Sequence, residues 1–440
     1  MSTRFAWLLG VVVLVSIGLL LACGTTYNAS SDGLVLVGSQ GSAAIQTFSF
    51  NLGSGHMSSV YNSTSSTVAS TCILPGLPSS IVLDPAGAYA YAIINAAHAC
   101  DTASTTTVNG ILAFKVNSDG TMTQVGSLNP DPNPVALFMD SAGKFLFVAE
   151  GLYSNAQAPN AQPCSGTTTQ FGICSYAIGS GASLTAVPGS FTLPAEIQTP
   201  NFAALAATPT VFPGIGLTGV KNGVCAGTAS NPPTSEFLYV TDSVNNVVLE
   251  LGVDPSSGAL KDPVQSFPVG AVPLGVAVDP CDRFVYVANN QSNTINAFTI
   301  CNGLSTQNPT SCPNTPGGDG TLIPVPGPPF SLSGGGANLP GPLVVDPFGN
   351  NLYVVGTGSN TISVFHISPV SGSLQAGTPA VVATGLRPTS IAIRSDDSWL
   401  FVTNFNAGTV SQYSITPATG SLSPQPAVTT DNYPWGVAVK

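Results

Sequence analysis

Three side chains in this chain, two carboxylates and one guanidinium, are of a type and at a position suited to acid–base chemistry. Glu150 and Asp242 each end a strand-like apolar run, and Arg387 directly precedes Pro388. A carboxyl beside a reacting bond can act as a general acid or base, and a guanidinium can stabilise a developing oxyanion. Glu is a poor turn former, so Glu150 at a strand end is a candidate for a ligand contact.

Other polar and aromatic residues occupy comparable places in the sequence. Asn289 and Asn404 end the corresponding runs, and Trp435 follows Pro434. Asn and Asp at such ends also serve the following turn, which is the structural alternative. Trp435 could stack on a sugar or another apolar face, or it could pack against its neighbours. The predicted ligand-binding residues are Glu150, Asp242, Asn289, Asn404, Arg387 and Trp435, of which Glu150, Asp242 and Arg387 are the only catalytic candidates.

Motifs for other chemistries are missing from the sequence. His56 falls in a turn, His98 lies beside Cys100 in a long loop, and His366 falls in a strand-like run. No Gly-x-Ser-x-Gly elbow, His-x-x-x-His pair or phosphate-cradling glycine loop occurs. We therefore predict no metal site and no cofactor.

The first 32 residues predict export and anchoring. Arg4 precedes an apolar stretch from Phe5 to Leu21, which is the pattern of a signal peptide. The ending Leu-Leu-Ala-Cys23 resembles a bacterial lipobox, and this resemblance implies cleavage after residue 22 and a lipid on Cys23. Residues 23–32 then form a tether between the lipid and the rest of the chain. The protein is expected at the outer membrane or cell surface, or in the periplasm. The alternative is an uncleaved membrane helix at the short limit for spanning a bilayer.

Composition narrows the class of partner. The 440 residues carry a net charge of −11 with only nine Lys and Arg, and 7% of residues are charged. Nucleic acid is excluded as a partner, because phosphate binding needs clustered cations. The partners left open are a small molecule, a glycan or an envelope protein.

A repeat settles the expected fold. A proline begins a short apolar run in seven places, and a Gly-x-Leu or similar turn follows three strand-like runs later at spacings of 48 to 76 residues. Periods of this length are typical of propeller blades. The chain opens in the second strand of a unit and closes with a first strand, 434–440, so the last strand would complete the first blade. We predict an all-β, seven-bladed propeller over residues 33–440, with first strands beginning at Pro78, Pro134, Pro200, Pro273, Pro340, Pro388 and Pro434.

The residue after each of these prolines is expected to line the mouth of the central channel. These residues are Ser79, Val135, Asn201, Leu274, Gly341, Thr389 and Trp435.

Eight cysteines follow Cys23, and an even number in an exported chain predicts disulfides. In a propeller, loops on opposite faces cannot meet, so only cysteines on one face can pair. We predict Cys72–Cys100, Cys164–Cys174, Cys225–Cys281 and Cys301–Cys312.

The repeat unit also resembles a known family. Runs such as Phe284-Val-Tyr-Val-Ala-Asn289 and Leu400-Phe-Val-Thr-Asn404 are similar to those of the propeller lactonases, which include 6-phosphogluconolactonase-like enzymes, and to those of YVTN-repeat surface proteins. Members of the lactonase family often carry Pro-Arg-His at the start of a first strand. None of the seven post-proline residues here is Arg, and the next residue is never His, so the resemblance assigns no catalytic residue.

Two functions fit these features of the sequence. The first is a lipid-anchored propeller that binds or organises without catalysis, which the missing Arg and His favour. The second is a lactonase-like hydrolase acting on a sugar lactone. It would be favoured if Glu150, Asp242 and Arg387 converged in one pocket.

Overall fold

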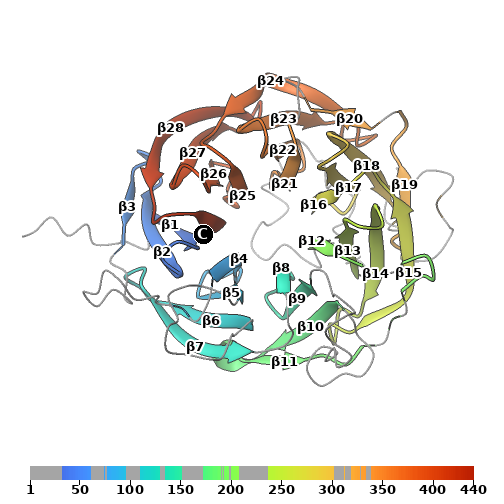
Figure 1. Ribbon diagram of the computed structural model, residues 1–440, viewed down its shortest axis with the longest axis horizontal. Helices are drawn as coiled ribbons and strands as arrows, with labels where there is room; N and C mark the ends of the chain where they lie inside the picture. Colours follow the sequence, from blue (N-terminus) through green and yellow to red (C-terminus); the bar gives the residue numbers. More distant parts are fainter. Residues whose placement is uncertain are drawn as a thin grey trace, which may run out of the picture.

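Seven antiparallel sheets, six of four strands and one of five, stand around a central axis, as predicted (Figure 1). This computed structural model describes residues 32–60, 74, 77–95, 110–128, 134–150, 172–189, 191, 193–197, 200–207, 236–301, 312, 319–327, 329–332 and 338–440. Within these ranges the helical structure is one 3₁₀ turn, η1 (Ser180–Ala182). The chain is rich in Gly and Pro and poor in charge, which suits short strands joined by tight turns.

The four strands of each blade run from the axis to the rim. The innermost strands are β29 (Pro434–Val439), β4 (Leu77–Leu83), β8 (Pro134–Met139), β12 (Phe202–Ala207), β16 (Pro273–Val278), β21 (Pro340–Val345) and β25 (Pro388–Ile393). The second strands are β1 (Asp32–Ser39), β5 (Tyr89–Asn95), β9 (Phe145–Glu150), β13 (Glu236–Asp242), β17 (Phe284–Asn289), β22 (Asn351–Gly356) and β26 (Trp399–Asn404).

The outer half of each blade completes the sheets. The third strands are β2 (Ala44–Asn51), β6 (Gly110–Val116), β10 (Ile173–Ile178), β14 (Val247–Val253), β18 (Thr294–Ile300), β23 (Thr361–Ile367) and β27 (Thr409–Thr416). The outer strands are β3 (Met57–Ser59), β7 (Met122–Leu128), β11 (Leu184–Ala186), β15 (Leu260–Pro268), β19 (Leu322–Pro324) with β20 (Phe330–Ser331), β24 (Leu374–Ala383) and β28 (Ser421–Thr429).

The C-terminal strand closes the ring, as the sequence predicts. β29 pairs antiparallel with β1, from Val35 opposite Val439 to Ser39 opposite Pro434, so blade 1 contains both ends of the described chain (Figure 1). The backbone N–H of Lys440 adds a hydrogen bond to the carbonyl of Leu34 at 2.9 Å. Closure removes the free inner edge that β1 would otherwise expose.

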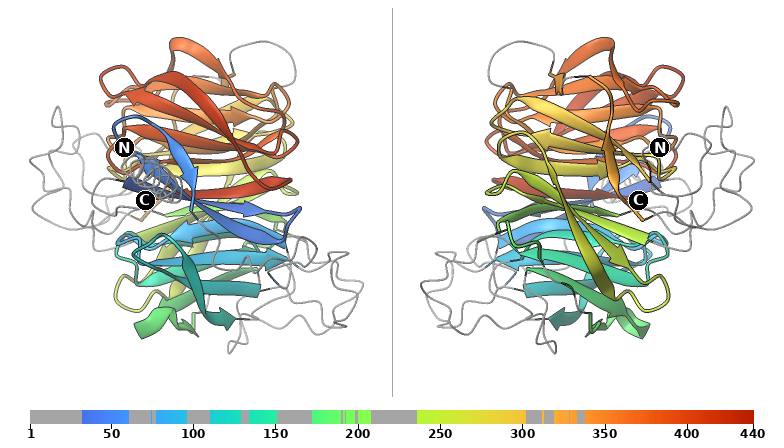
Figure 2. Two further views of the ribbon diagram at one scale, coloured as in Figure 1. Left: turned by 90° about the vertical axis from the view of Figure 1, so that its left-hand side faces the viewer. Right: turned by 90° about the vertical axis from the view of Figure 1, so that its right-hand side faces the viewer.

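Seven apolar clusters fill the seven interfaces between neighbouring blades. Figure 2 shows the blades edge-on, with their strands crossing the thickness of the disc. The cluster between blades 7 and 1 contains Phe50, Trp399 and Phe401 together with Val437 of the closing strand. The core is therefore a continuous ring, and the closing strand supplies part of it.

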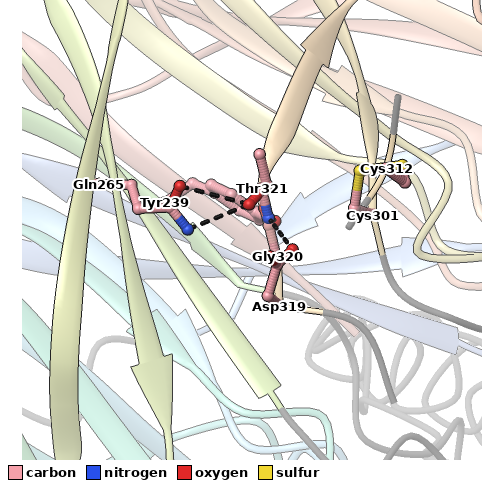
Figure 3. The surroundings of a disulfide bond; sticks show 7 residues. All are labelled: Tyr239, Gln265, Cys301, Cys312, Asp319, Gly320 and Thr321. Carbon is pink, nitrogen blue, oxygen red and sulfur yellow. Dashed lines mark hydrogen bonds between the residues drawn. A yellow bond between two sulfur atoms is a disulfide. The ribbon is translucent and has the colours of Figure 1, made fainter. Parts of the chain in front are cut away.

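Steric contacts explain why glycine occurs in the Gly-x-Leu turns. A Cβ added at Gly372 would lie 2.5 Å from the ring of Phe284 in the preceding blade, and the φ angle of Gly372 is +71°. Only glycine accepts both conditions without strain. The carbonyl of Gly372 accepts a 3.0 Å hydrogen bond from the Tyr286 hydroxyl, and Tyr239 bonds Gly320 at 2.9 Å in the same way (Figure 3). The repeat motif therefore marks where each blade meets the one before it.

The described residues confirm one predicted disulfide. Cys301 and Cys312 are joined, with Cα atoms 5.5 Å apart (Figure 3). Cys174 and Cys281 are also disulfide-bonded. Their predicted partners Cys164 and Cys225 lie outside the described residues, as do Cys23, Cys72 and Cys100.

Candidate functional site

A cavity of about 610 Å³ lies on the axis, where the seven innermost strands meet. Its walls include six of the seven predicted channel residues: Ser79, Val135, Leu274, Gly341, Thr389 and Trp435. Asn290, Thr357 and Arg387 line it from the turns that follow second strands or precede innermost ones. The cavity therefore reaches the face that carries these turns, and we call that end the channel mouth.

A break in strand register aims these side chains at the axis. Pro388 pairs with Asn404 and Ser390 pairs with Thr403, so Thr389 between them has no partner in the second strand. Leu274 lies in the same kind of bulge in blade 5. Proline lacks the N–H that would continue the ladder, and a bulge re-aims the extra side chain. The sequence position after the proline is therefore a site position for a structural reason.

Blade 4 corrects one channel prediction. Phe202, rather than Pro200, occupies the proline register position opposite Asp242, and the bulged residue is Ala203. Ala203 lines the cavity, and Asn201 does not. The apolar run of β12 is short and alanine-rich, so counting from its proline placed the register two residues too early. The corrected positions, Ala203 and Ala204, still offer neither Arg nor His.

The described lining of the cavity is almost uncharged. Arg387 is its only ionisable side chain, and the described lining contains no carboxylate and no imidazole. Several hydroxyls there are engaged by the backbone. Thr389 donates to the carbonyl of Trp435 at 3.0 Å, and Ser390 accepts from the N–H of Val437 at 3.3 Å. These contacts join blade 7 to the closing strand. They engage two of the hydroxyls of a described lining that has no carboxylate or imidazole.

Arg387 belongs to an aromatic cluster at the mouth that is centred on Phe405. Its guanidinium carbon lies 4.8 Å from the centroid of the Phe405 ring, within the range of a cation–π contact. Phe405 lies 4.9 Å from Tyr433 and 5.4 Å from Trp435, measured between ring centroids. Arg387 and Tyr433 are exposed, and Trp435 is half-buried. Of the predicted site residues, the structure brings Arg387 and Trp435 together.

The polar residues that end the second strands are bound within their own turns. Asp242 is fully buried and accepts from the N–H of Val244 at 3.0 Å and from the Asn245 amide at 2.7 Å. Asn404 is also fully buried, and its amide donates to the Thr409 hydroxyl across the turn at 3.0 Å. The Asn289 amide donates to Asn296 at 2.7 Å. None of the three lines the cavity. Their geometry matches the turn role that the sequence left open.

Glu150 is the last residue of β9 and pairs with Pro134 in β8. Its side chain lies outside what the structure describes. Asp242 belongs to blade 4 and Arg387 precedes blade 7, and only Arg387 lines the cavity. The described residues therefore do not bring Asp242 and Arg387 into one pocket.

Three buried acids in the described part of the chain, Glu250, Glu236 and Asp397, have raised pKa values, and none of them lines the cavity. Burial, opposed by a hydrogen bond from Gln265, raises the pKa of Glu250 to about 8. Burial, with the nearby charge of Asp140, raises the pKa of Glu236 to about 7. Burial, with the nearby charge of Asp346, likewise raises the pKa of Asp397 to about 7. The raised pKa values of these three groups affect the pH dependence of folding stability and not the chemistry of the channel mouth.

Two histidines fall in the described residues, and both have local roles. His366 Nδ1 lies 2.8 Å from the Asn351 amide oxygen, and His56 Nδ1 lies 3.1 Å from the Ser58 hydroxyl. Across the described ranges no three His, Cys, Asp or Glu side chains gather in a way that could hold a metal ion.

Comparison with known proteins agrees with this architecture. The model of the family described as "Lactonase, 7-bladed beta-propeller" matches residues 217–312 and 326–439. This chain is a lactonase-type seven-bladed propeller. No curated protein matches it in sequence. Within the described part of this lactonase-type propeller, no helix is long and apolar enough to cross a membrane.

Solved structures with the same fold are distant in sequence. A periplasmic gluconolactonase from Pseudomonas aeruginosa is 16% identical, with a TM-score of 0.64 over 93% of this chain and 99% of that one. A putative 6-phosphogluconolactonase from Bacteroides fragilis is 17% identical, with a TM-score of 0.62 over 93% and 98%. One from Bacteroides uniformis is 16% identical, with a TM-score of 0.63 over 93% and 100%. At these identities the likeness establishes the fold alone.

Proposed function

We propose that this lactonase-type propeller binds a small molecule at the channel mouth without catalysing a reaction on it. The observation that carries the proposal is the described lining of the cavity, which offers one guanidinium and several neutral groups. Hydrolysis of an ester or lactone needs a proton acceptor or donor beside the reacting bond. The guanidinium of Arg387 only donates hydrogen bonds, so it cannot serve as the proton acceptor.

Lactone hydrolysis is the second candidate function. The family match and the names of the three solved relatives favour it. Glu150 is the residue of this chain that could supply a base, because it ends a second strand next to Pro134.

A turnover assay separates the two candidates. We expect purified protein to hydrolyse δ-gluconolactone no faster than buffer does, while small ring compounds quench the fluorescence of Trp435, the more exposed of the two tryptophans after the leader. Proton release at constant pH measures the first quantity. Turnover that disappears in Glu150→Gln would establish the hydrolase instead.

The propeller is further proposed to be exported and held in the cell envelope by a lipid on Cys23. The support is the sequence Leu-Leu-Ala-Cys at residues 20–23 and the start of β1 at Asp32, which leaves a tether of about nine residues.

Replacement of the lipid acceptor tests this anchoring. In cells that make Cys23→Ser, we expect the protein to move from the membrane fraction to the soluble fraction or to keep its uncleaved leader. Fractionation and intact mass measure both outcomes. Metabolic labelling with a fatty acid should mark wild type and not the variant, and equal labelling of both would disprove the assignment.

A further inference from the structure

In four blades, the residue just before the innermost strand lies on the face that carries the channel mouth and has an unusual backbone conformation. These residues immediately precede an innermost strand and have left-handed backbone angles: Val272 at φ +54°, Leu339 at +49°, Arg387 at +52° and Tyr433 at +61°. Such angles are rare for bulky side chains and persist only where the surroundings enforce them. Here the carbonyl of each accepts a hydrogen bond of 2.9 to 3.1 Å from the residue after a second strand. We call these four the rim residues.

The rim differs in chemistry around the ring. Val272 and Leu339 make it apolar over blades 5 and 6, while Arg387 and Tyr433 supply a cation and a phenol over blades 7 and 1. Phe405 lies between these two and contacts both of their side chains. Trp435 meets Phe405 edge-on at 88° and continues the aromatic wall into the cavity. The mouth therefore has one quadrant with a distinct surface.

Arg387 is held in place and yet has no acidic partner. Within the described residues, the other two arginines each pair with a nearby carboxylate, Arg283 with Asp279 at 2.5 Å and Arg394 with Asp396 at 3.1 Å. The N–H of Arg387 is bound to the Asn360 side chain at 2.7 Å, and its guanidinium lies over Phe405. No described carboxylate lies within ion-pair distance of it, in a chain with 20 acidic residues.

We propose that the quadrant formed by Arg387, Phe405, Tyr433 and Trp435 recognises the carboxylate of a small aromatic acid. A planar guanidinium pairs with a carboxylate through two parallel hydrogen bonds. The ring of the ligand packs against the Trp435 and Tyr433 side chains at a separation typical of aromatic pairs. This assignment rests on the proposed small-molecule function and names its ligand class.

The wall chemistry selects an aromatic ring over a sugar. A buried sugar must exchange its water contacts for protein hydrogen bonds, since unpaired hydroxyls are costly. At the mouth, Thr389 and Ser390 already bond to the backbone of the closing strand. The remaining surface of the quadrant is aromatic, which suits a flat apolar ring with one charged group.

Benzoate and its neutral analogue benzamide test the assignment. Isothermal titration of the purified protein measures the two affinities, with acetate as the carboxylate that lacks a ring. We expect benzoate to bind about ten- to a hundredfold more tightly than benzamide, the range for a hydrogen-bonded charge. Acetate should bind too weakly to measure.

Two variants locate the effect. Arg387→Met keeps an apolar stem over Phe405 and removes the charge, so it should weaken benzoate about tenfold or more and leave benzamide unchanged. Trp435→Leu should weaken both ring compounds. Lys115→Met removes an exposed charge on β6 in another blade and should change neither affinity.

The outcomes separate the two proposals. Equal binding of benzoate and benzamide, with both lost in Trp435→Leu, would overturn carboxylate recognition and leave the small-molecule function standing. If none of the probes binds at the mouth, both proposals fail. An unchanged benzoate affinity in Arg387→Met, with the circular dichroism of a folded protein, would also overturn the assignment.

Discussion

Removal of residues 434–440 will abolish the cooperative unfolding of the propeller. The deleted strand pairs with β1 and supplies Val437 to the cluster between blades 7 and 1. Without it, β1 becomes an open edge, and its fully buried residues Leu34–Val37 lose one neighbouring strand. An exposed apolar edge pairs with other chains, so we expect aggregates in place of a monomer. Size-exclusion chromatography and urea unfolding followed by circular dichroism measure both effects.

A permuted chain provides the matched control. Val439 lies opposite Val35, and Lys440 bonds Leu34, so the end of the closing strand is next to the start of β1. Placing residues 434–440 ahead of residue 32 through a short linker turns β29 and β1 into an ordinary hairpin. This permuted chain should regain the monomer and the sharp transition. A truncated chain that stays monomeric and unfolds like wild type would refute the role of the strand.

Raising the pH from 5 to 8.5 will lower the free energy of unfolding by several kcal/mol. In the folded protein the pKa of Glu250 is about 8, and those of Glu236 and Asp397 are about 7, above ordinary values of 4.5 and 3.8. In this window the folded state holds protons that the unfolded state has released, so stability falls as pH rises. The contribution is fully present below the unfolded pKa values and is lost through the folded ones. Urea midpoints across this range measure the change.

Glu250→Gln should remove the largest share of this dependence. Glutamine keeps an acceptor for the Gln265 amide, which lies 3.0 Å from Glu250, and never ionises. At pH 8.5 the variant should be more stable than wild type by about 2–4 kcal/mol, since each unit of pKa difference corresponds to about 1.4 kcal/mol. At pH 5 the two should be nearly equal.

The same substitution at an exposed glutamate is the control. Glu196 is exposed and accepts from the Ser266 hydroxyl at 2.6 Å, which lowers its pKa. Glu196→Gln should therefore bring no gain in stability at pH 8.5. If Glu250→Gln also brings none, Glu250 is charged in the folded protein, and the stated cause of the pH dependence is wrong.

The blade count and the closure could be predicted because local chemistry repeats. Proline near the start of an innermost strand and glycine at a third-to-outer turn are positions where backbone geometry leaves little choice, as Pro388 and Gly372 show. Such positions can be counted from one sequence. In blade 4 the same count failed by two residues, because the strand there starts at Phe202 rather than at the proline.

The site could be predicted only in part. The post-proline rule found Trp435 and Thr389, since a bulge sets their direction whatever the side chain. Asn404 ends its strand, but its amide is bound to Thr409 across the turn, while Phe405 directly after it belongs to the cluster at the mouth. The sequence signal for Phe405 and Tyr433 was present in their positions beside Asn404 and Pro434. Successive side chains of an extended chain point to opposite sides, so the residue next to a buried strand end can face the mouth.

The bulge after each innermost proline has a consequence for how such a protein changes over generations. Because Val135, Leu274 and Thr389 have no register partner in the second strand, their replacement breaks no backbone hydrogen bond of the ladder. Each blade of the propeller therefore offers one position on the wall of the shared cavity whose side chain can change. The ligand selectivity of the cavity can then change by substitution in one blade at a time, while the strands that surround the cavity keep their arrangement.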